Sequence, residues 1–389
     1  MTRPLRVLLF VLAAATVMLA FGYLAPVHIP FQLDFQVLWH AGVGVLRGVP
    51  LYDREAQTAL VAAMNGTPVE QQFVIPFPYP PWLVTFTLPL ALLPVEVAAR
   101  VWFLLNVTML CTAVWLLSRA WPSWARWVAL PAAALFPPVL GALYVGQFVF
   151  PALLGMALLI HALRGRHVLA LAIAAALTSV KPHVGVFALA AAALCIWRAE
   201  KTFRISVLRA LLVTAVALLA VGLIADPAWP LTYPRSLAAF SHVSRCDLCV
   251  SLPMVIGQVL ELDFTQAALL AGGLLLLAVV LAALFRDRLA QLDIEATVSL
   301  AVCLGLLINP YLQNYDFTFL VLAFLVIAGR LRSIGAWLAF VAAYVAPWIG
   351  LGIFGRDGNA VLLTCAALLA LLTIALTHWP PRHRMLSTE

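Results

Sequence analysis

Residues 33–53 read LDFQVLWHAGVGVLRGVPLYD and form the first polar corner of an otherwise largely apolar chain. Apolar residues recur there at three- and four-residue spacing, which predicts an amphipathic helix. Such a helix lies on a membrane surface better than it spans a bilayer. Asp34 stands at its start, where the first hydrophobic run should leave the membrane. This acidic corner is our first candidate for chemistry, and the alternative is a solvated carboxylate at a helix end.

The composition predicts an all-α polytopic membrane protein. Hydrophobic residues make up 65% and charged residues 10% of the 389 residues, whereas soluble domains average about 45–50% and 25%. Such a chain could hold about twelve transmembrane helices of ~20 residues each. The net charge of +7 does not indicate nucleic acid, because the basic residues sit as short pairs between hydrophobic runs, the pattern of membrane topology. The lipid bilayer is therefore the expected partner.

Charge and hydropathy together predict one integral membrane domain over residues 1–389, with both termini cytoplasmic. The first span, residues 5–25, lacks an A-x-A-like cleavage site and is expected to be retained. The outer loop that follows should hold interfacial helices and a proline-rich stretch, IPFPYPPW, that cannot form a regular helix. We expect the first outer loop at 26–81, the second at 226–263, a basic cytoplasmic loop at 198–209 and a cytoplasmic tail at 379–389.

Two apolar segments depart from regular spans. Residues 82–93 are too few to cross a bilayer, which predicts a helix in the outer leaflet. Residues 127–137 should run toward the outer face and break at the Pro137–Pro138 pair. The segment GALYVGQ at 141–147 is then expected to form an outer turn. Most arginines fall on the cytoplasmic side of this path. The basic residues left outside are Arg47, Arg54, Arg100, Lys181, Arg235, Arg245 and Arg356.

Lys181 interrupts an apolar run on the outer side, beside Pro182 and His183. An ionisable residue in such a run needs a partner, which makes it a candidate functional residue. A cation beside a neutral donor at a helix break suits a phosphate or diphosphate. The alternative is a lysine that reaches out to the lipid headgroups.

Other polar positions suit substrate binding less specifically. The Gln147 amide could bind a sugar hydroxyl or bridge two helices, and Asn309 and Tyr311 belong to a polar outer turn that suits carbohydrate or any turn. His242 and Arg245 lie on the second outer loop, which could close over a phosphate.

Neither a metal nor a cofactor is expected. Cys246 and Cys249 form a lone C-x-x-C, which is half of a zinc site and could instead close a small disulfide on an oxidising face. No His, Asp and Glu set has metal-ligand spacing. The sequence also lacks a phosphate-binding loop, a dinucleotide fingerprint and a nucleophile elbow.

The ordered motifs resemble glycosyltransferase family 87, whose members are membrane glycosyltransferases of the C-type fold. The matching pieces are DFQVLWHAGVGVLRGVPLY from Asp34, FPYPP from Phe77 with Tyr79 at its centre, Gly146–Gln147 and Lys181–Pro182. They occur in the family's order, and the resemblance covers residues from about 30 to 330.

This resemblance implies transfer of a sugar from a polyprenyl-phosphate carrier to a lipid or glycan acceptor at the outer face of the plasma (inner) membrane. Mannose and arabinofuranose are the family's sugars. The resemblance also implies that Asp34 is the general base and that Tyr79 lies in the substrate site. The chemistry of the reaction independently supports a single carboxylate as the base, because transfer to a hydroxyl needs one group to take its proton. Direct attack would invert the anomeric centre.

The rival interpretation is a multi-pass transporter or a flippase for lipid-linked sugars. Those classes usually show internal repeats and polar residues near the midplane of the membrane. We find no repeat in this sequence, and the polar positions cluster toward one predicted face. The sequence therefore favours an enzyme.

Overall fold

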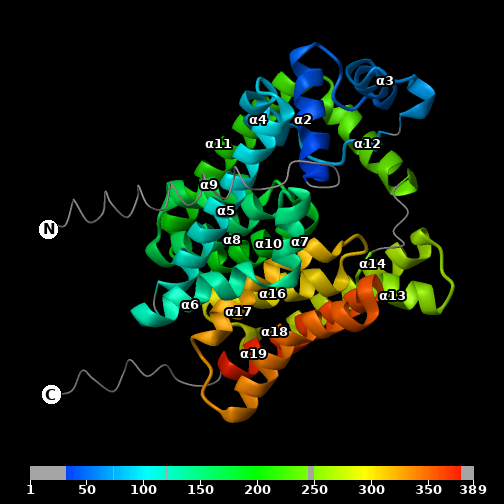
Figure 1. Ribbon diagram of the computed structural model, residues 1–389. Coiled ribbons are helices and arrows are strands. Elements are labelled where there is room, and N and C mark those ends of the chain that lie inside the picture. The colour runs from blue at the N-terminus through cyan, green and yellow to red at the C-terminus, as the bar shows by residue number, and fades with distance from the viewer. Residues whose placement is uncertain (1–31, 73, 120, 244–248, 378–389) are drawn as a thin grey trace, which may run out of the picture. The chain divides into compact units, whose positions relative to one another are not determined.

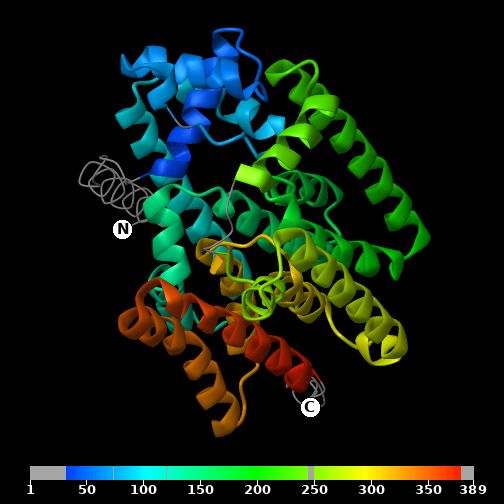
Figure 2. The same cartoon turned by 90° about the vertical axis from the view of Figure 1, so that its right-hand side faces the viewer.

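The computed structural model describes residues 32–72, 74–119, 121–243 and 249–377, and every regular element within them is a helix (Figure 1, Figure 2). The all-α prediction is confirmed for this part of the chain. The predicted first span and the tail from residue 379 lie outside the described residues. The first ten elements are α2 (Leu33–Leu46), α3 (Arg54–Asn65), η1 (Val69–Gln71), α4 (Pro81–Ala91), α5 (Val95–Ser118), α6 (Ser123–Ala134), α7 (Pro137–Val145), α8 (Val149–Gly165), α9 (Val168–Thr178) and α10 (Pro182–Trp197).

The second half of the chain continues in the same way, with three longer apolar helices among shorter ones. Its elements are α11 (Lys201–Ala225), α12 (Trp229–Val243), α13 (Leu252–Val259), α14 (Phe264–Leu284), α15 (Arg286–Leu289), α16 (Ile294–Ile308), η3 (Asn314–Phe319), α17 (Leu320–Ala328), α18 (Ile334–Phe354), η4 (Gly355–Ala360) and α19 (Val361–Thr377).

The described residues fall into two compact units. Those of the first unit lie within Met1–Leu110, Ala142–Phe150 and Ala215–Arg245. Those of the second lie within Cys111–Gly141, Pro151–Thr214 and Cys246–Glu389. Both units are therefore assembled from segments that are distant in the sequence.

In the first unit, α2 packs against α4. Gly42 permits the close approach, because a Cβ atom there would lie 2.9 Å from the Ala91 Cβ. The Trp39 indole N–H donates to the Leu93 carbonyl at 3.1 Å and ties the end of α4 to α2. α3 begins at Asp53, whose carboxylate accepts from the Ala56 N–H at 3.0 Å as a helix cap.

In the second unit, α16 packs against both α10 and α19, and α18 lies beside α19 (Figure 2). Gly305 lets α16 approach α10, because a Cβ atom there would lie 2.7 Å from the Phe187 ring. α17 is apolar along its whole length, and Leu320 to Ile327 are all buried. A helix that is apolar on every side belongs in a core or in a membrane.

Five described helices are long and apolar enough to cross a bilayer, and a sixth span results if α6 and α7, bent by 59°, count as one. Much of the surface of α11 and α14 is exposed apolar side chain, which suits contact with lipid. Other predicted spans form short apolar helices. An example is α9, whose 11 residues extend about 16 Å against a hydrocarbon core of about 30 Å. The protein is thus a multi-pass membrane protein by composition and helix length, and the count of about twelve spans stays a prediction.

Two loop predictions were wrong. Residues 141–145 are not part of a turn, because the helix that begins at Pro137 continues to Val145, and the break before α8 is confined to residues 146–148. Proline fits the first turn of a helix, where its missing N–H is not needed, so the proline pair starts α7. The predicted break at this pair is confirmed by the 59° bend between α6 and α7. The basic loop at 198–209 is likewise mostly helix, since α11 begins at Lys201.

The predicted outer loops contain more helix than coil. The first holds α2 and α3, as expected, and residues 74–80 stay non-helical until Pro81 opens α4, which confirms the short helix after the proline-rich stretch. Phe35, Leu38 and Gly42, which recur at three- and four-residue spacing, are buried on α2, whereas Leu46, four residues after Gly42, is exposed. The second loop holds α12 and α13.

The predicted sidedness can be tested by cysteine labelling in intact cells. Glu70 and Thr202 are exposed positions in the first outer loop and at the start of α11. We expect Glu70→Cys to react with a membrane-impermeant maleimide from outside, and Thr202→Cys to react only after permeabilisation, because basic residues favour the cytoplasmic side. The unsubstituted chain gives the background of its own cysteines. Labelling of position 202 but not of position 70 would reverse the topology.

Candidate functional site

Gln32 fixes the start of α2 in the first unit. Its backbone N–H donates to the Tyr144 carbonyl at 2.8 Å, and its side-chain amide donates to the Leu143 carbonyl at 2.7 Å. Gln32 is fully buried and has a φ of 59°, a left-handed conformation that is unfavourable for a residue with a side chain. These two bonds hold that conformation and anchor the first turn of α2 to the end of α7.

Asp34 lies in that first turn and is bound by Gln147. The Gln147 Nε2 donates to the Asp34 Oδ2 at 2.7 Å. The orientation of the amide is determined by its other end, because the Gln147 Oε1 accepts the Phe148 backbone N–H at 3.1 Å. An N–H donor matches an ionised carboxylate, which can only accept hydrogen bonds. The structure therefore joins two of the residues singled out in the sequence.

Gly146 and two side chains of α5 hold Gln147 in place. Gly146 has a φ of +72°, and a Cβ atom there would lie 2.5 Å from the Gln32 Oε1 and 2.8 Å from the Phe35 Cβ. The Trp102 indole donates to the Gly146 carbonyl at 2.8 Å, and the Asn106 amide donates to the Gln147 carbonyl at 3.3 Å. Only glycine fits at 146, which explains the Gly-Gln pair at this place in the sequence.

Asp34 also lines a cleft of about 370 Å³ in the first unit. The cleft is formed by α2, α3 and the proline-rich stretch. Many of its walls are amides and other polar groups that can bind hydroxyls. The polar lining residues are Asp34, Gln36, His40, Tyr52, Arg54, Gln57, Asn65 and Gln72.

His40 and Tyr52 are uncharged donors and acceptors in this cleft at neutral pH. Burial lowers the pKa of His40, which favours the neutral imidazole. Burial also raises the pKa of Tyr52, so its hydroxyl keeps its proton and donates to the Tyr79 carbonyl at 2.8 Å. The Tyr79 ring packs edge-on against Phe148, at 4.6 Å between centroids. Tyr79 therefore supports the segment that carries Gln147.

In the second unit Lys181 has an anionic partner inside the protein. Its Nζ lies 2.7 Å from the Asp316 Oδ1, and the two side chains are 3% and 1% exposed. The ammonium also lies 4.9 Å from the centre of the Tyr315 ring. The second Asp316 oxygen accepts the Gln313 backbone N–H at 2.9 Å and caps η3. Lys181 thus does not reach out to headgroups, and the partner that we expected to be a lipid phosphate is Asp316.

His183, Asn309 and Tyr311 gather in the same unit. The Asn309 amide donates to the His183 carbonyl at 2.7 Å, and its oxygen accepts the Tyr311 N–H at 2.9 Å. The His183 and Tyr311 rings meet edge to face, at 6.2 Å between centroids. Asn309 therefore bridges α10 and the turn after α16, a structural task that the sequence had left open beside sugar binding.

The remaining candidates lie at the edge of what the structure describes. The Arg245 residue and the His242 side chain are outside the described part. Cys249 is disulfide-bonded, and Cys246 is outside the described residues.

The model of glycosyltransferase family 87 matches residues 77–310, which is more than half of the chain. The chain belongs to glycosyltransferase family 87. It is therefore a glycosyltransferase, and this membership favours the enzyme over the transporter. The chain has no significant match among curated proteins or solved structures. Asp34 precedes the matched region of this family 87 enzyme, whereas Gln147, Lys181 and Asn309 lie within it.

Sequence reasoning missed several groups that build the cleft of this family 87 enzyme. The sequence analysis did not single out His40, although it follows Asp34 on the same helix. Arg54 had been noted only as a basic residue on the outer side. Asn106 carried a usable signal, because an amide inside an apolar span is costly unless it is hydrogen-bonded. The sequence gives no comparable signal for Gln32, since its role depends on a segment that lies 111 residues further along the chain.

The Lys181–Asp316 pair generates a stability prediction. Removing one partner of a buried ion pair leaves an uncompensated charge, which typically costs about 3–5 kcal/mol. We expect Lys181→Met to lower the free energy of unfolding by about that amount, and the double variant Lys181→Met/Asp316→Leu to recover much of the loss. Thermal unfolding of purified protein measures both. Lys201→Met, which removes an exposed lysine, is the control and should be neutral. Unchanged stability of Lys181→Met with weakened donor binding would make lipid phosphate the partner after all.

Proposed function

We propose that this family 87 enzyme transfers a sugar from a polyprenyl-phosphate carrier to a hydroxyl of a lipid or glycan acceptor. The sugar is a mannose-like hexose or arabinofuranose, and Asp34 is the general base. The observation that supports this role is that Asp34, held by the Gln147 amide, lines a cleft that also carries polar side chains. The charge pattern of the sequence supports a site on the outer face of the inner membrane.

The lining of the cleft suits sugars. Its amides, with the neutral imidazole of His40 and the protonated hydroxyl of Tyr52, offer donors and acceptors without adding charge. Sugar hydroxyls both donate and accept, so such groups can orient a sugar or a sugar-like acceptor. Gln57 is held by a bond from its amide to the Pro50 carbonyl at 3.1 Å, which fixes one wall.

Two arginines beside this cleft are better placed than Lys181 to bind the donor phosphate. Arg54 lines the cleft, and its Nε donates to the Val74 carbonyl at 2.9 Å, which fixes the guanidinium at the rim. A smaller cleft shares Tyr52, Arg54 and Pro76 with the first and adds Arg235. Guanidinium groups bind phosphate oxygens through paired hydrogen bonds. We place the donor phosphate between Arg54 and Arg235.

The reaction then needs few groups. The acceptor oxygen attacks the anomeric carbon as its proton passes to Asp34, and the bond from that carbon to the phosphate oxygen breaks. The phosphate leaves as a weak base, so no general acid is required, and the arginines stabilise the charge that develops on it. Direct attack gives inversion at the anomeric carbon.

Asp34→Asn tests the base. The amide keeps the size of the side chain but cannot accept the proton, and loss of a general base typically costs about 100- to 10,000-fold in rate. We expect that loss in sugar transfer from polyprenyl-phosphate mannose or arabinofuranose, with donor binding retained. Asp53→Asn is the matched control, because asparagine also caps a helix, and it should keep its activity. A near-normal rate for Asp34→Asn would remove Asp34 from the mechanism.

Arg235→Gln and Arg54→Gln test the phosphate site. A hydrogen bond to a charged group contributes about 1.5–3 kcal/mol, so each change should weaken donor binding roughly 10- to 100-fold. Direct binding of the polyprenyl-phosphate donor measures the effect. Arg47→Gln, an exposed change at the end of α2, is the control. If Lys181→Met weakens donor binding while both arginine variants do not, the phosphate site belongs at Lys181.

A further inference from the structure

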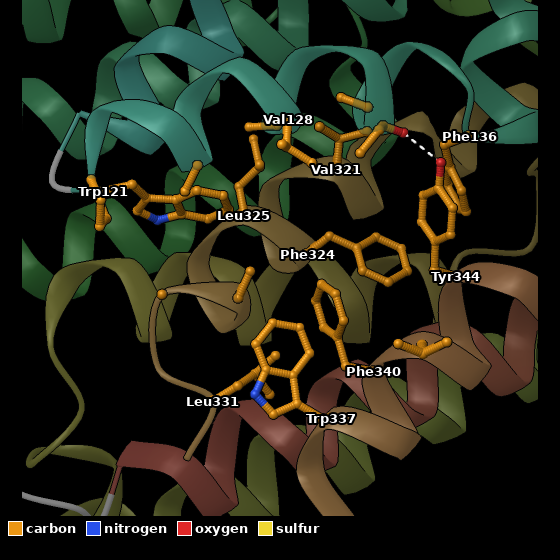
Figure 3. A pocket seen from close by; sticks show the side chains of 18 of the residues that line it. Trp121, Val128, Phe136, Val321, Phe324, Leu325, Leu331, Trp337, Phe340 and Tyr344 are labelled. Atoms are coloured by element: carbon orange, nitrogen blue, oxygen red, sulfur yellow. Dashed lines mark hydrogen bonds between the residues drawn. The ribbon is translucent and has the colours of Figure 1, made fainter. Parts of the chain in front are cut away.

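A second cavity lies within the unit that holds Lys181, between α6, α17 and α18 (Figure 3). Its volume is about 550 Å³, which falls in the range of about 300–1,000 Å³ that ligand sites occupy. Its walls are mostly apolar, with four packed rings. Phe324 lies 5.3 Å from Phe136, 5.3 Å from Phe340 and 5.8 Å from Tyr344, measured between ring centroids.

The lining offers few polar groups to a ligand. The Tyr344 hydroxyl donates to the Ala132 carbonyl at 2.7 Å, the bond that is dashed in Figure 3. The other lining side chains are alkyl or phenyl groups, except the indoles of Trp121 and Trp337 and the guanidinium of Arg332. A sugar placed here would lose hydrogen bonds to water without replacing them. The cavity therefore suits a hydrocarbon chain.

One end of the cavity has the character of a membrane interface. Figure 3 shows Trp121 and Leu331 toward one end and Phe136 and Tyr344 toward the other. Trp121 precedes α6, and Leu331 and Arg332 lie in the turn from α17 to α18, with Trp337 following in α18. Tryptophan is enriched at the boundary between headgroups and hydrocarbon, so this end is expected at the headgroup level.

Arg332 supplies positive charge at that end. The neighbouring Arg330 is neutralised, since it lies 2.8 Å from Asp293 and 3.5 Å from Glu295. Arg332 is exposed and forms no ion pair within the residues that the structure describes. Basic turns are expected on the cytoplasmic side, where the leaflet carries anionic lipids.

The flanks of the cavity are exposed apolar surface. Val128 on α6 and Val341 on α18 both line it and are 58% and 48% exposed. Leu338, on the same stretch of α18, is 66% exposed. In a bilayer these side chains face lipid, so a chain can enter the cavity from the side.

We propose that this cavity, the α6–α18 groove, binds one acyl chain of an anionic phospholipid of the cytoplasmic leaflet, with the lipid phosphate at Arg332. The groove has the apolar wall that an acyl chain requires, and Arg332 complements the charge of the headgroup. This site is separate from the donor site, whose phosphate is proposed at the outer face. The inference does not rest on the assignment of Asp34.

Photolabelling of the full-length protein in nanodiscs tests the groove. The probe is phosphatidylglycerol with a photoreactive acyl chain, in a matrix of phosphatidylcholine, and labelled peptides are mapped. We expect labelling on α6 and α18, and reduced labelling in Ala125→Phe, which fills the groove from α6. Ala282→Phe, on the exposed surface of α14, is the matched control and should label normally.

Arg332→Gln tests the contribution of the charge to lipid binding separately from that of the apolar wall. Because Arg332 is exposed, this change leaves the core intact. A basic residue near an anionic surface contributes enough to change binding roughly fivefold. We expect Arg332→Gln to reduce labelling by the phosphatidylglycerol probe by about that factor. Labelling by a phosphatidylcholine probe should fall much less, and Arg288→Gln, an exposed control, should change neither.

The groove proposal fails if α6 and α18 are labelled only at the background level. That result is expected if another segment of the chain fills the groove. It also fails if Ala125→Phe and Ala282→Phe label alike, or if excess polyprenyl phosphate displaces the probe and phosphatidylglycerol does not.

Discussion

The hydrogen bond from the Gln147 amide to the Asp34 carboxylate joins residues 113 positions apart, and the first unit is arranged around it. The bond requires the amide to be oriented by the Phe148 N–H, the turn at Gly146 to stay free of a side chain, and Gln32 to hold a left-handed conformation. Backbone groups of Phe148, Leu143 and Tyr144 meet the first and third requirements, and a glycine meets the second. A carboxylate in apolar surroundings is costly without such partners, so the site is built from the groups that satisfy Asp34.

The need of a buried charged group for a partner also explains a contact in the second unit. Lys181 is buried among apolar helices, and Asp316 completes its environment. A buried pair of this kind adds little net stability compared with apolar residues of the same size, but losing one partner is expensive. The pair is therefore best understood as a specific contact between the start of α10 and η3. In the proposed reaction, Arg54 and Arg235, which line clefts, would bind the donor phosphate in place of Lys181.

Membership of family 87 assigns the class of reaction, and the cleft adds a physical account of how it could proceed. One carboxylate, uncharged hydrogen-bonding groups and guanidinium groups are sufficient for transfer from a phosphate leaving group, because that group departs without a proton. The α6–α18 groove has the opposite chemistry, with apolar walls and a single arginine at its mouth. The two cavities therefore suit the two different roles proposed for them, a catalytic site and a lipid-binding groove.

The amino-acid sequence by itself determined the helical class, the membrane setting, the short α4 after the proline-rich stretch and the choice of Asp34 and Gln147, because hydropathy and helix-breaking residues act locally. Local signals located the break before Pro137 but misplaced the turn at 141–147 and the start of α11, since proline and charged residues fit inside the first turn of a helix as well as in a loop. The partners of polar residues were decided only by tertiary structure. Lys181 could have bound lipid phosphate, lipid headgroups or a carboxylate, and only the folding of η3 against α10 brings Asp316 to it, across 135 positions of sequence.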